Sequence, residues 1–310
     1  MRIRILGSAA GGGFPQWNCG CGNCIAVRDH GRARGGAFRG KARTQAQLAL
    51  SEDGSTWFLA GASPDLAAQI ESSPELHPRG LRDSPLAGVV LASADLDHIL
   101  GLLLLREFQP LRVYAAPSIL RILREENSAF AMLNRVEPQV AWTAVNASAP
   151  FPLLSASGED SGLQCEVHYL SGRYPQYVKG ETRGLVCEEA TAALFFESAA
   201  GKRVAYIPAV GRLDDALLEE IRRCRLLLFD GTFWSDDELQ RVLGAGETAH
   251  QMGHIPVEET LRLLKGVAVE RKLFIHVNNT NPILNETSRE YQAVREAGWE
   301  VAEDNWELEL

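Results

Sequence analysis

Two carboxylates and an imidazole follow directly on a short apolar segment. Asp95, Asp97 and His98 come after residues 88–92, which have the composition of a buried strand. Side chains at such a strand end project into a loop at one edge of a sheet, where α/β proteins commonly build their sites. Ser93 or Asp95 could instead cap the following helix, with Asp97 favoured by the helix dipole. Capping explains one acid but not two acids and a histidine together, so the pattern favours a metal site.

A second strand-end histidine lies far along the chain. His276 interrupts the apolar segment 272–277 and precedes the loop sequence Asn278-Asn-Thr-Asn-Pro282. Alone, such a histidine would be assigned a structural role. We expect it to join Asp97 and His98, which gives a set of two imidazoles and one carboxylate, with Asp95 as an additional member.

Three of the six cysteines form a compact motif. Cys19, Cys21 and Cys24 are spaced Cys-x-Cys-x-x-Cys, and the small residues between them let three sulfurs converge on one tetrahedral ion. In a reducing compartment such a cluster more often binds metal than forms disulfides. We therefore predict a structural zinc site, and only three thiols make an iron–sulfur cluster less favoured. The motif does not contain a fourth ligand, for which His30 is one candidate.

The elements that must position these groups alternate between strand and helix. Strands are predicted over 2–6, 45–50, 56–59, 88–92, 111–115, 165–170, 192–197, 204–207, 226–230 and 272–277. Helices are predicted over 64–70, 95–108, 118–127, 236–242, 257–264 and 288–297. Because both halves repeat this order and no linker separates them, we expect an α/β fold with two sheets flanked by helices in one domain, residues 1–310.

Composition excludes several classes of protein. The 310 residues include 45% hydrophobic residues, as in ordinary globular proteins, and carry a formal net charge of −9. No long basic run stands out, which argues against nucleic acid and against an anionic membrane surface. The first residues do not form a secretory signal, and the apolar run 100–105 is too short to span a bilayer. We expect a cytoplasmic protein, with Cys165, Cys187 and Cys224 as small core residues; a homodimer stays open.

The segment 93–98 resembles the His-x-His-x-Asp-His signature of the metallo-β-lactamase superfamily. The whole chain is similar to the family of pyrroloquinoline quinone (PQQ) biosynthesis protein B. This similarity is carried by the residues Met1–Cys19, Trp234–Glu238, Gly253–Pro256 and His276–Pro282. The resemblance implies an αββα sandwich with two central mixed sheets, and it covers essentially the full length.

Departures from the superfamily signature bear on the chemistry. The two leading histidines fall on Ser93 and Asp95, whereas Asp97, His98 and His276 are retained. The third-motif histidine falls near Ser171 or Gly172, and the bridging aspartate falls near Ala209. Too few ligands remain to hold two ions and a bridging hydroxide, which weakens the hydrolase hypothesis. The retained residues match a mononuclear non-haem Fe(II) site, although zinc would accept the same ligands.

The resemblance implies an activity. It implies an iron-dependent hydroxylase that uses dioxygen to hydroxylate the tyrosine ring of a cross-linked glutamate–tyrosine intermediate cut from a precursor peptide, next to other proteins of the PQQ pathway. The alternatives are a carrier that transports PQQ or its precursor, and a zinc-dependent hydrolase. A related phosphodiesterase branch places a ligating histidine at the position of Asn279, which makes Asn279 a second candidate for the fourth zinc ligand.

Further residues are expected to act on the substrate. In hydrolases of this fold a histidine in the region of His254 assists the leaving group. His254 is therefore a candidate general acid or base, or a donor to a substrate carboxylate; the alternative is an ordinary loop histidine. Arg173, Tyr174, Tyr177 and Lys179 form a basic, aromatic segment where the third metal motif should be. We predict that they bind an acidic, aromatic substrate, although each alone could be a solvated loop residue.

Overall fold

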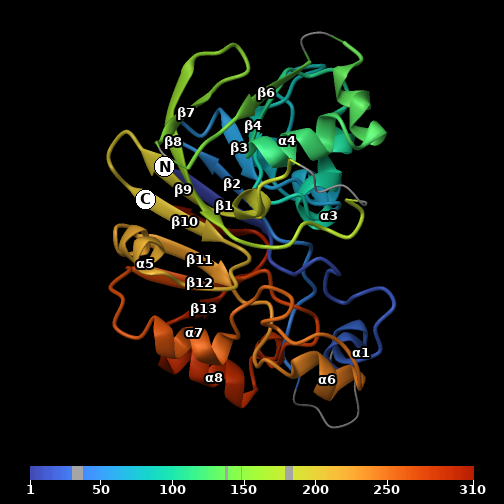
Figure 1. Ribbon diagram of the computed structural model, residues 1–310, viewed down its shortest axis with the longest axis vertical. Helices are drawn as coiled ribbons and strands as arrows, with labels where there is room; N and C mark the ends of the chain where they lie inside the picture. The colour runs from blue at the N-terminus through green and yellow to red at the C-terminus, as the bar shows by residue number, and fades with distance from the viewer. Residues whose placement is uncertain (30–37, 137–138, 148, 179–183) are drawn as a thin grey trace. The chain divides into compact units, whose positions relative to one another are not determined.

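The chain forms two compact units, each built from discontinuous segments (Figure 1). The computed structural model describes residues 1–29, 38–136, 139–147, 149–178 and 184–310. Unit 1 comprises Met1–Leu6, Gln47–Arg203 and Asn305–Leu310, and unit 2 comprises Gly7–Ala46 and Val204–Asp304. The single domain over 1–310 stays a prediction.

Unit 1 contains a seven-stranded mixed sheet and three further antiparallel strands. The sheet has the order β14-β1-β2-β3-β4-β5-β6. Its strands are β1 (Arg2–Gly7), β2 (Gln47–Ser51), β3 (Trp57–Ala60), β4 (Leu86–Val90), β5 (Leu111–Ala115), β6 (Val140–Ala144) and β14 (Trp306–Glu309). The antiparallel strands are β7 (Phe151–Leu154), β8 (Asp160–Leu170) and β9 (Thr191–Ser198). Because β1 pairs with β14, the two chain termini lie side by side (Figure 1).

Helices of unit 1 are short and pack on this sheet. They are α2 (Leu66–Glu71), α3 (Leu96–Ile99), α4 (Pro117–Arg124) and the 3-10 helices η1 (Pro74–Leu76), η2 (Leu100–Leu105), η3 (Ser128–Asn134) and η4 (Cys187–Ala190). Helix α4 places Ile119, Ile122 and Leu123 on one face, at the i, i+3, i+4 spacing of a buried stripe. These side chains join Val89 and Val113 in one core cluster, so burial of this face holds α4 to the sheet.

Unit 2 is organised around four parallel strands. Their order is β13-β12-β11-β10. The strands are β10 (Arg203–Ile207), β11 (Leu226–Asp230), β12 (Arg271–Ile275) and β13 (Glu300–Val301), and the helices are α1 (Gly22–Arg28), α5 (Asp215–Arg222), α6 (Glu238–Leu243), α7 (Val257–Leu263), α8 (Arg289–Glu296) and the 3-10 helix η5 (Pro282–Leu284). Helix α8 packs against β13. Trp299 stacks on Phe274 with ring centroids 4.3 Å apart and meets Phe229 edge-on, which anchors this core.

Two predicted elements differ from the structure. The helix predicted over 95–108 is one α-helical turn, α3, followed by the 3-10 helix η2. The chain cannot continue as an α-helix because the His98 carbonyl accepts from Ala62 N, while Gly101 N donates to the Ala62 carbonyl. The strand predicted over 2–6 alternates polar and apolar residues, as a half-buried strand does, but only Arg2 is exposed. Its inward-facing Arg4 is accommodated by ion pairs with Glu75 and Glu307.

The predicted α/β class, with mixed sheets flanked by helices, is confirmed. The predicted hairpin is present as antiparallel β2 and β3, and β5 and β11 match their predicted bounds. Sequence reasoning missed β6, β7, β13, β14, α1 and α5. In the described residues, no helix is long and apolar enough to cross a membrane. Cys165 and Cys224 are buried as predicted, but Cys187 is exposed, so its assignment to the core was wrong.

Candidate metal centres

His276 lies where two parallel strands of unit 2 end. Strands β11 and β12 pair in register from Leu226 and Arg271 to Asp230 and Ile275, so their carboxyl ends meet at one sheet edge. His276 is the next residue after β12, and its φ of 59° is in the left-handed region. This conformation is uncommon for a residue with a Cβ and is often found at functional sites. It also explains why the strand ends two residues before the predicted boundary at 277.

A threonine hydroxyl determines which nitrogen of His276 carries hydrogen. Thr232 Oγ1 lies 2.7 Å from Asp230 Oδ1 and 2.8 Å from His276 Nδ1. A hydroxyl has one hydrogen to donate, and an aspartate carboxylate can only accept. The Thr232 hydrogen therefore goes to Asp230, and His276 Nδ1–H donates to Thr232. The lone pair of the neutral imidazole is then on Nε2, the form that binds a metal through that atom.

The same aspartate orients His254. His254 Nδ1 lies 2.8 Å from Asp230 Oδ2, so this imidazole also carries its hydrogen on Nδ1. The rings of His254 and His276 are 5.7 Å apart at their centroids and nearly parallel. Asp230, His254 and His276 are all buried, and one ligand atom from each lies within 4.8 Å of the others.

Asp230 itself is better suited to orienting the histidines than to binding a metal. Its Oδ1 accepts from Thr232 N and Thr232 Oγ1, and its Oδ2 accepts from Val210 N and His254 Nδ1. These four hydrogen bonds use the roughly four acceptor positions of a carboxylate. Asp230 thus holds the two imidazoles in place, and its oxygens have no acceptor position left for a metal.

Unit 1 repeats this arrangement at the end of β4. Ser93 Oγ donates to Asp95 Oδ2 over 2.7 Å and lies 2.8 Å from His98 Nδ1. By the same argument, His98 Nδ1–H donates to Ser93, and the His98 lone pair is on Nε2. His98 Nε2 and Asp97 Oδ2 are 3.9 Å apart. Two ligands of one ion at about 2.1 Å each can be separated by up to about 4.2 Å, so this pair fits metal binding.

Of the three residues predicted at this site in unit 1, Asp95 has a different role from Asp97 and His98. Asp97 and His98 present ligand atoms to the same space, whereas Asp95 supports His98 through the Ser93 hydroxyl. Histidine ligands in metalloproteins almost always donate their second N–H to a carboxylate, a carbonyl or water. Both histidines here donate to a hydroxyl that is itself bonded to a carboxylate. The donor set therefore fits a hard or borderline divalent ion such as Fe(II) or Zn(II).

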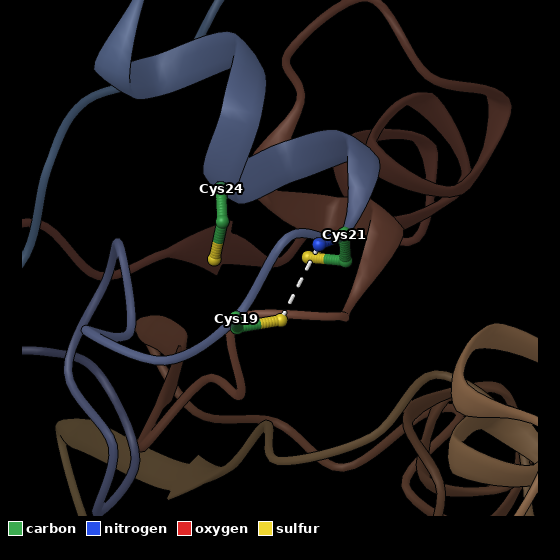
Figure 2. Close-up of side chains that lie close together, drawn as sticks. All are labelled: Cys19, Cys21 and Cys24. Atoms are coloured by element: carbon green, nitrogen blue, oxygen red, sulfur yellow. Dashed lines mark hydrogen bonds between the residues drawn. The ribbon is translucent and has the colours of Figure 1, made fainter.

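The cysteine motif is also assembled as predicted. Cys19, Cys21 and Cys24 turn their sulfurs toward one another at the start of α1 (Figure 2), and all three lie within 4.8 Å. Sulfurs on one tetrahedral zinc would be about 3.8 Å apart for Zn–S bonds of about 2.3 Å, so only small shifts separate the cluster from a closed site. Asn279 Nδ2 lies 3.3 Å from Cys24 Sγ and 3.6 Å from Cys21 Sγ, which places the predicted fourth-ligand candidate at the cluster.

The thiols of the cluster are not equivalent. Burial alone would raise the pKa of the Cys19 thiol, but hydrogen bonds from Cys21, Cys24 and Asn279 lower it below its ordinary value. Burial raises the pKa of Cys21 to about 11, only partly opposed by a hydrogen bond from the Cys24 backbone. Thiolates are the metal-binding form. The thiolate form is therefore more favoured at Cys19 than at Cys21.

Predicted substrate-binding residues have structural contacts of their own. The hydroxyl of Tyr174 donates to the Val186 carbonyl and that of Tyr177 to the Ala94 carbonyl, and both rings pack against the core of unit 1. Arg173 is exposed. Lys179 and the alternative zinc ligand His30 lie outside the described residues. A substrate-binding role for this segment stays a prediction.

Sequence reasoning missed Asp230, Thr232 and Asn23. A signal was present for the first two, since Asp230 ends a predicted apolar strand and Thr232 follows it by two residues, much as Ser93 and Asp95 follow the strand predicted over 88–92. Asn23 is inside the cysteine motif, but nothing in its spacing distinguishes it from a residue that only fills the turn.

Comparison with known proteins decides the family. The family model of the beta-lactamase superfamily domain matches residues 56–277. The chain is 40% identical to coenzyme PQQ synthesis protein B of Methylobacterium sp. (strain 4-46) and 39% identical to that of Rhodopseudomonas palustris (strain TIE-1), over the whole of each chain. The chain belongs to the coenzyme PQQ synthesis protein B family. The family resemblance inferred from the motifs is thereby confirmed.

Solved structures agree with this assignment. A crystal structure of zinc-bound PqqB from Methylobacterium extorquens matches the whole chain with a TM-score of 0.90 and 37% identity. A diphosphatase from the PhnP family matches with a TM-score of 0.68 at 18% identity, which shows a shared fold only. The metallo-β-lactamase fold predicted from residues 93–98 is confirmed, as is the expectation of a metal-binding family.

Proposed function

We propose that this chain acts in PQQ synthesis as a metal-dependent oxygenase. Its substrate would be the cross-linked glutamate–tyrosine intermediate, hydroxylated on the tyrosine ring. The observation that carries the proposal is the pair of carboxylate–hydroxyl–imidazole chains, Asp95–Ser93–His98 and Asp230–Thr232–His276. A histidine that only fills a core needs no such control of its tautomer, whereas a metal ligand does.

The ligand set Asp97, His98 and His276 for one Fe(II) remains our proposal from the sequence. It is supported in each unit separately. In unit 1, Asp97 and His98 have ligand atoms at a suitable spacing, and in unit 2 His276 is oriented with its lone pair on Nε2. When bound, Fe(II) would supply the redox chemistry that dioxygen requires. Two imidazoles and one carboxylate would leave coordination positions open for substrate and dioxygen, as a catalytic metal site requires.

His254 is the residue best placed to move a proton near His276. Its Nδ1–H is held by Asp230, so Nε2 is the atom that accepts a proton, and the resulting imidazolium would be stabilised by the Asp230 carboxylate. A tyrosine-derived phenol that loses its proton to His254 would become a better electron donor for ring oxidation. His254 is buried, which keeps bulk water from competing for the proton.

A dioxygen assay tests the proposal. Each hydroxylation inserts one oxygen atom into a ring C–H bond, and reduction of the other atom to water needs two electrons and two protons. Protein carrying zinc at the cysteines would be loaded anaerobically with Fe(II) and mixed with the tyrosine-derived precursor and a reductant such as ascorbate. We expect dioxygen uptake and a product heavier by one oxygen atom, both abolished in His98→Ala and His276→Ala.

The same assay separates the alternatives. Turnover without dioxygen, or with zinc in place of iron, would identify a hydrolase and contradict the oxygenase. Tight binding of PQQ without turnover under any metal would identify a carrier. His168→Ala is a suitable control, because His168 lies on β8 and belongs to neither carboxylate–hydroxyl–imidazole chain, so dioxygen uptake should be unchanged.

A further inference from the structure

Asn23 lies inside the cysteine motif, and its side chain forms hydrogen bonds with a distant loop of unit 2. Its amide nitrogen Nδ2 donates to the backbone carbonyls of Asn279, at 3.1 Å, and Asn281, at 2.9 Å. An amide has two N–H groups, and both are thereby used on one loop. Cys21 Sγ adds a weaker contact of 3.6 Å to the Asn279 carbonyl. The start of α1, which carries the sulfurs in Figure 2, is thus joined to the loop 276–281.

The other side of this loop is held by the end of β11. Asn278 N donates to the Thr232 carbonyl over 3.1 Å, and Asn281 Nδ2 donates to the Gly231 carbonyl over 2.9 Å. Thr232 is also the residue that orients His276. Residues 276–281 are therefore hydrogen-bonded on one side to the end of β11, where Thr232 controls the His276 tautomer. On the other side they are hydrogen-bonded to Asn23 of the cysteine motif.

Asn279 provides a second link between the cluster and this loop. Its side-chain amide faces the sulfurs of Cys21 and Cys24, while its backbone carbonyl accepts from Asn23. Asn279 and Asn281 are buried, so their hydrogen bonds are shielded from water and costly to lose. A change in how the cysteines converge would therefore move the backbone two to five residues after His276.

We propose that Asn23 is a positioning residue that couples the cysteine-bound zinc to the His276 metal site. Zinc binding draws Cys19, Cys21 and Cys24 together and holds α1 in place, and Asn23 then holds the His276 loop in its metal-binding conformation. The inference rests on the proposed metal site at His276. It assigns the cysteine cluster a role beyond local folding, because loss of zinc would weaken a metal site to which no cysteine contributes a ligand.

Two substitutions of Asn23 and one matched control test this coupling. Asn23→Ala removes both donors, and Asn23→Asp keeps the shape but replaces the donor nitrogen by oxygen. Asn18→Ala is the control, because Asn18 belongs to the same segment, is exposed and, among the described residues, accepts a side-chain hydrogen bond only from Gln16. Each variant would be purified with zinc, and three quantities measured: zinc per chain, the dissociation constant for Co(II) added as a probe of the His276 site, and hydrogen exchange of residues 276–282.

We expect both Asn23 variants to retain the cysteine-bound zinc, to exchange faster at 276–282, and to bind Co(II) about tenfold to a hundredfold more weakly. The coupling is overturned if both Asn23 variants match Asn18→Ala in exchange and Co(II) affinity. It is also overturned if they lose the zinc while the exchange of 276–282 stays unchanged. Failure of the proposed metal site looks different: wild-type protein and His276→Ala would bind Co(II) alike, and the exchange measurement alone would then decide the role of Asn23.

Discussion

Substitution of Thr232 by valine tests the assignment of the His276 tautomer directly. Valine has nearly the shape of threonine but lacks the hydroxyl that bonds both Asp230 Oδ1 and His276 Nδ1. Thr232 is buried, so water cannot easily replace the hydroxyl. His276 Nδ1–H would lose its acceptor, and a buried donor without a partner costs about 1–3 kcal/mol. The imidazole would then no longer be held with its lone pair on Nε2.

The expected effect on metal binding follows from the same contact. Loss of an outer-shell partner typically costs about 10–100-fold in metal affinity, which corresponds to about 1.4–2.8 kcal/mol. Asp230 would keep its bonds to Thr232 N, Val210 N and His254 Nδ1, so the surrounding structure should persist. The variant should therefore stay folded, at a cost of about 1–3 kcal/mol in the free energy of unfolding, and its metal affinity can be measured on the folded protein.

Competition of Co(II) between the protein and a chelator of known affinity would measure this change, with zinc already bound at the cysteines. Thr232→Ser is the matched control, because it removes a methyl group but keeps the hydroxyl. The serine variant should bind Co(II) within about threefold of wild type. If the valine and serine variants bind Co(II) equally well, the hydroxyl does not control the imidazole and the tautomer argument fails.

Three further predictions concern other parts of the chain. Ser93→Ala should weaken metal binding at His98 about tenfold in the Co(II) competition experiment, whereas Ser93→Thr keeps the hydroxyl and should not. An equal loss of affinity in both variants would show that packing, and not the hydroxyl, is responsible. Cys21→Ser should lower zinc content and cost several kcal/mol in urea unfolding, whereas Cys187→Ser, at an exposed position, should match wild type in both measurements. Burial raises the pKa of Glu238 from 4.5 to about 7, although hydrogen bonds from Thr280 and Trp234 oppose the increase. Between pH 4.5 and pH 7 the folded chain therefore binds more protons than the unfolded chain. Stability should therefore fall by about 3 kcal/mol as pH rises from 4.5 to 7, and Glu238→Gln should abolish this part of the slope; an unchanged slope would contradict the shift.

Local patterns predicted most of what positions the sites. The strand β11 and the turn between β2 and β3 follow from apolar runs and turn residues, which are properties of neighbouring residues. The helix predicted over 95–108 failed because its hydrogen bonds go to Ala62, more than thirty residues away. The apolar spacing of a helix is the same whether its carbonyls bond within the helix or to a distant residue, so periodicity alone could not reveal this.

Site residues that are close in the sequence could also be predicted, whereas contacts between distant residues could not. Cys19, Cys21 and Cys24 converge within one short segment, so their spacing was sufficient to predict the cluster. By contrast, Asp230 orients His254 and His276 from positions 24 and 46 residues away. Such partners are set by the register of parallel strands β11 and β12, which sequence spacing does not encode.

The departures from the superfamily signature acquire a physical meaning from these contacts. At Ser93 and Asp95 the superfamily has metal-binding histidines, and their replacement first suggests a site that has only lost ligands. In this structure the two residues instead form a chain to His98 that matches the chain from Asp230 through Thr232 to His276. Fewer ligands with more strictly held tautomers favour one ion with open positions over two ions and a bridging hydroxide. If the proposed one-ion site is correct, the residues that replace the two leading histidines also hold His98 in its metal-binding tautomer.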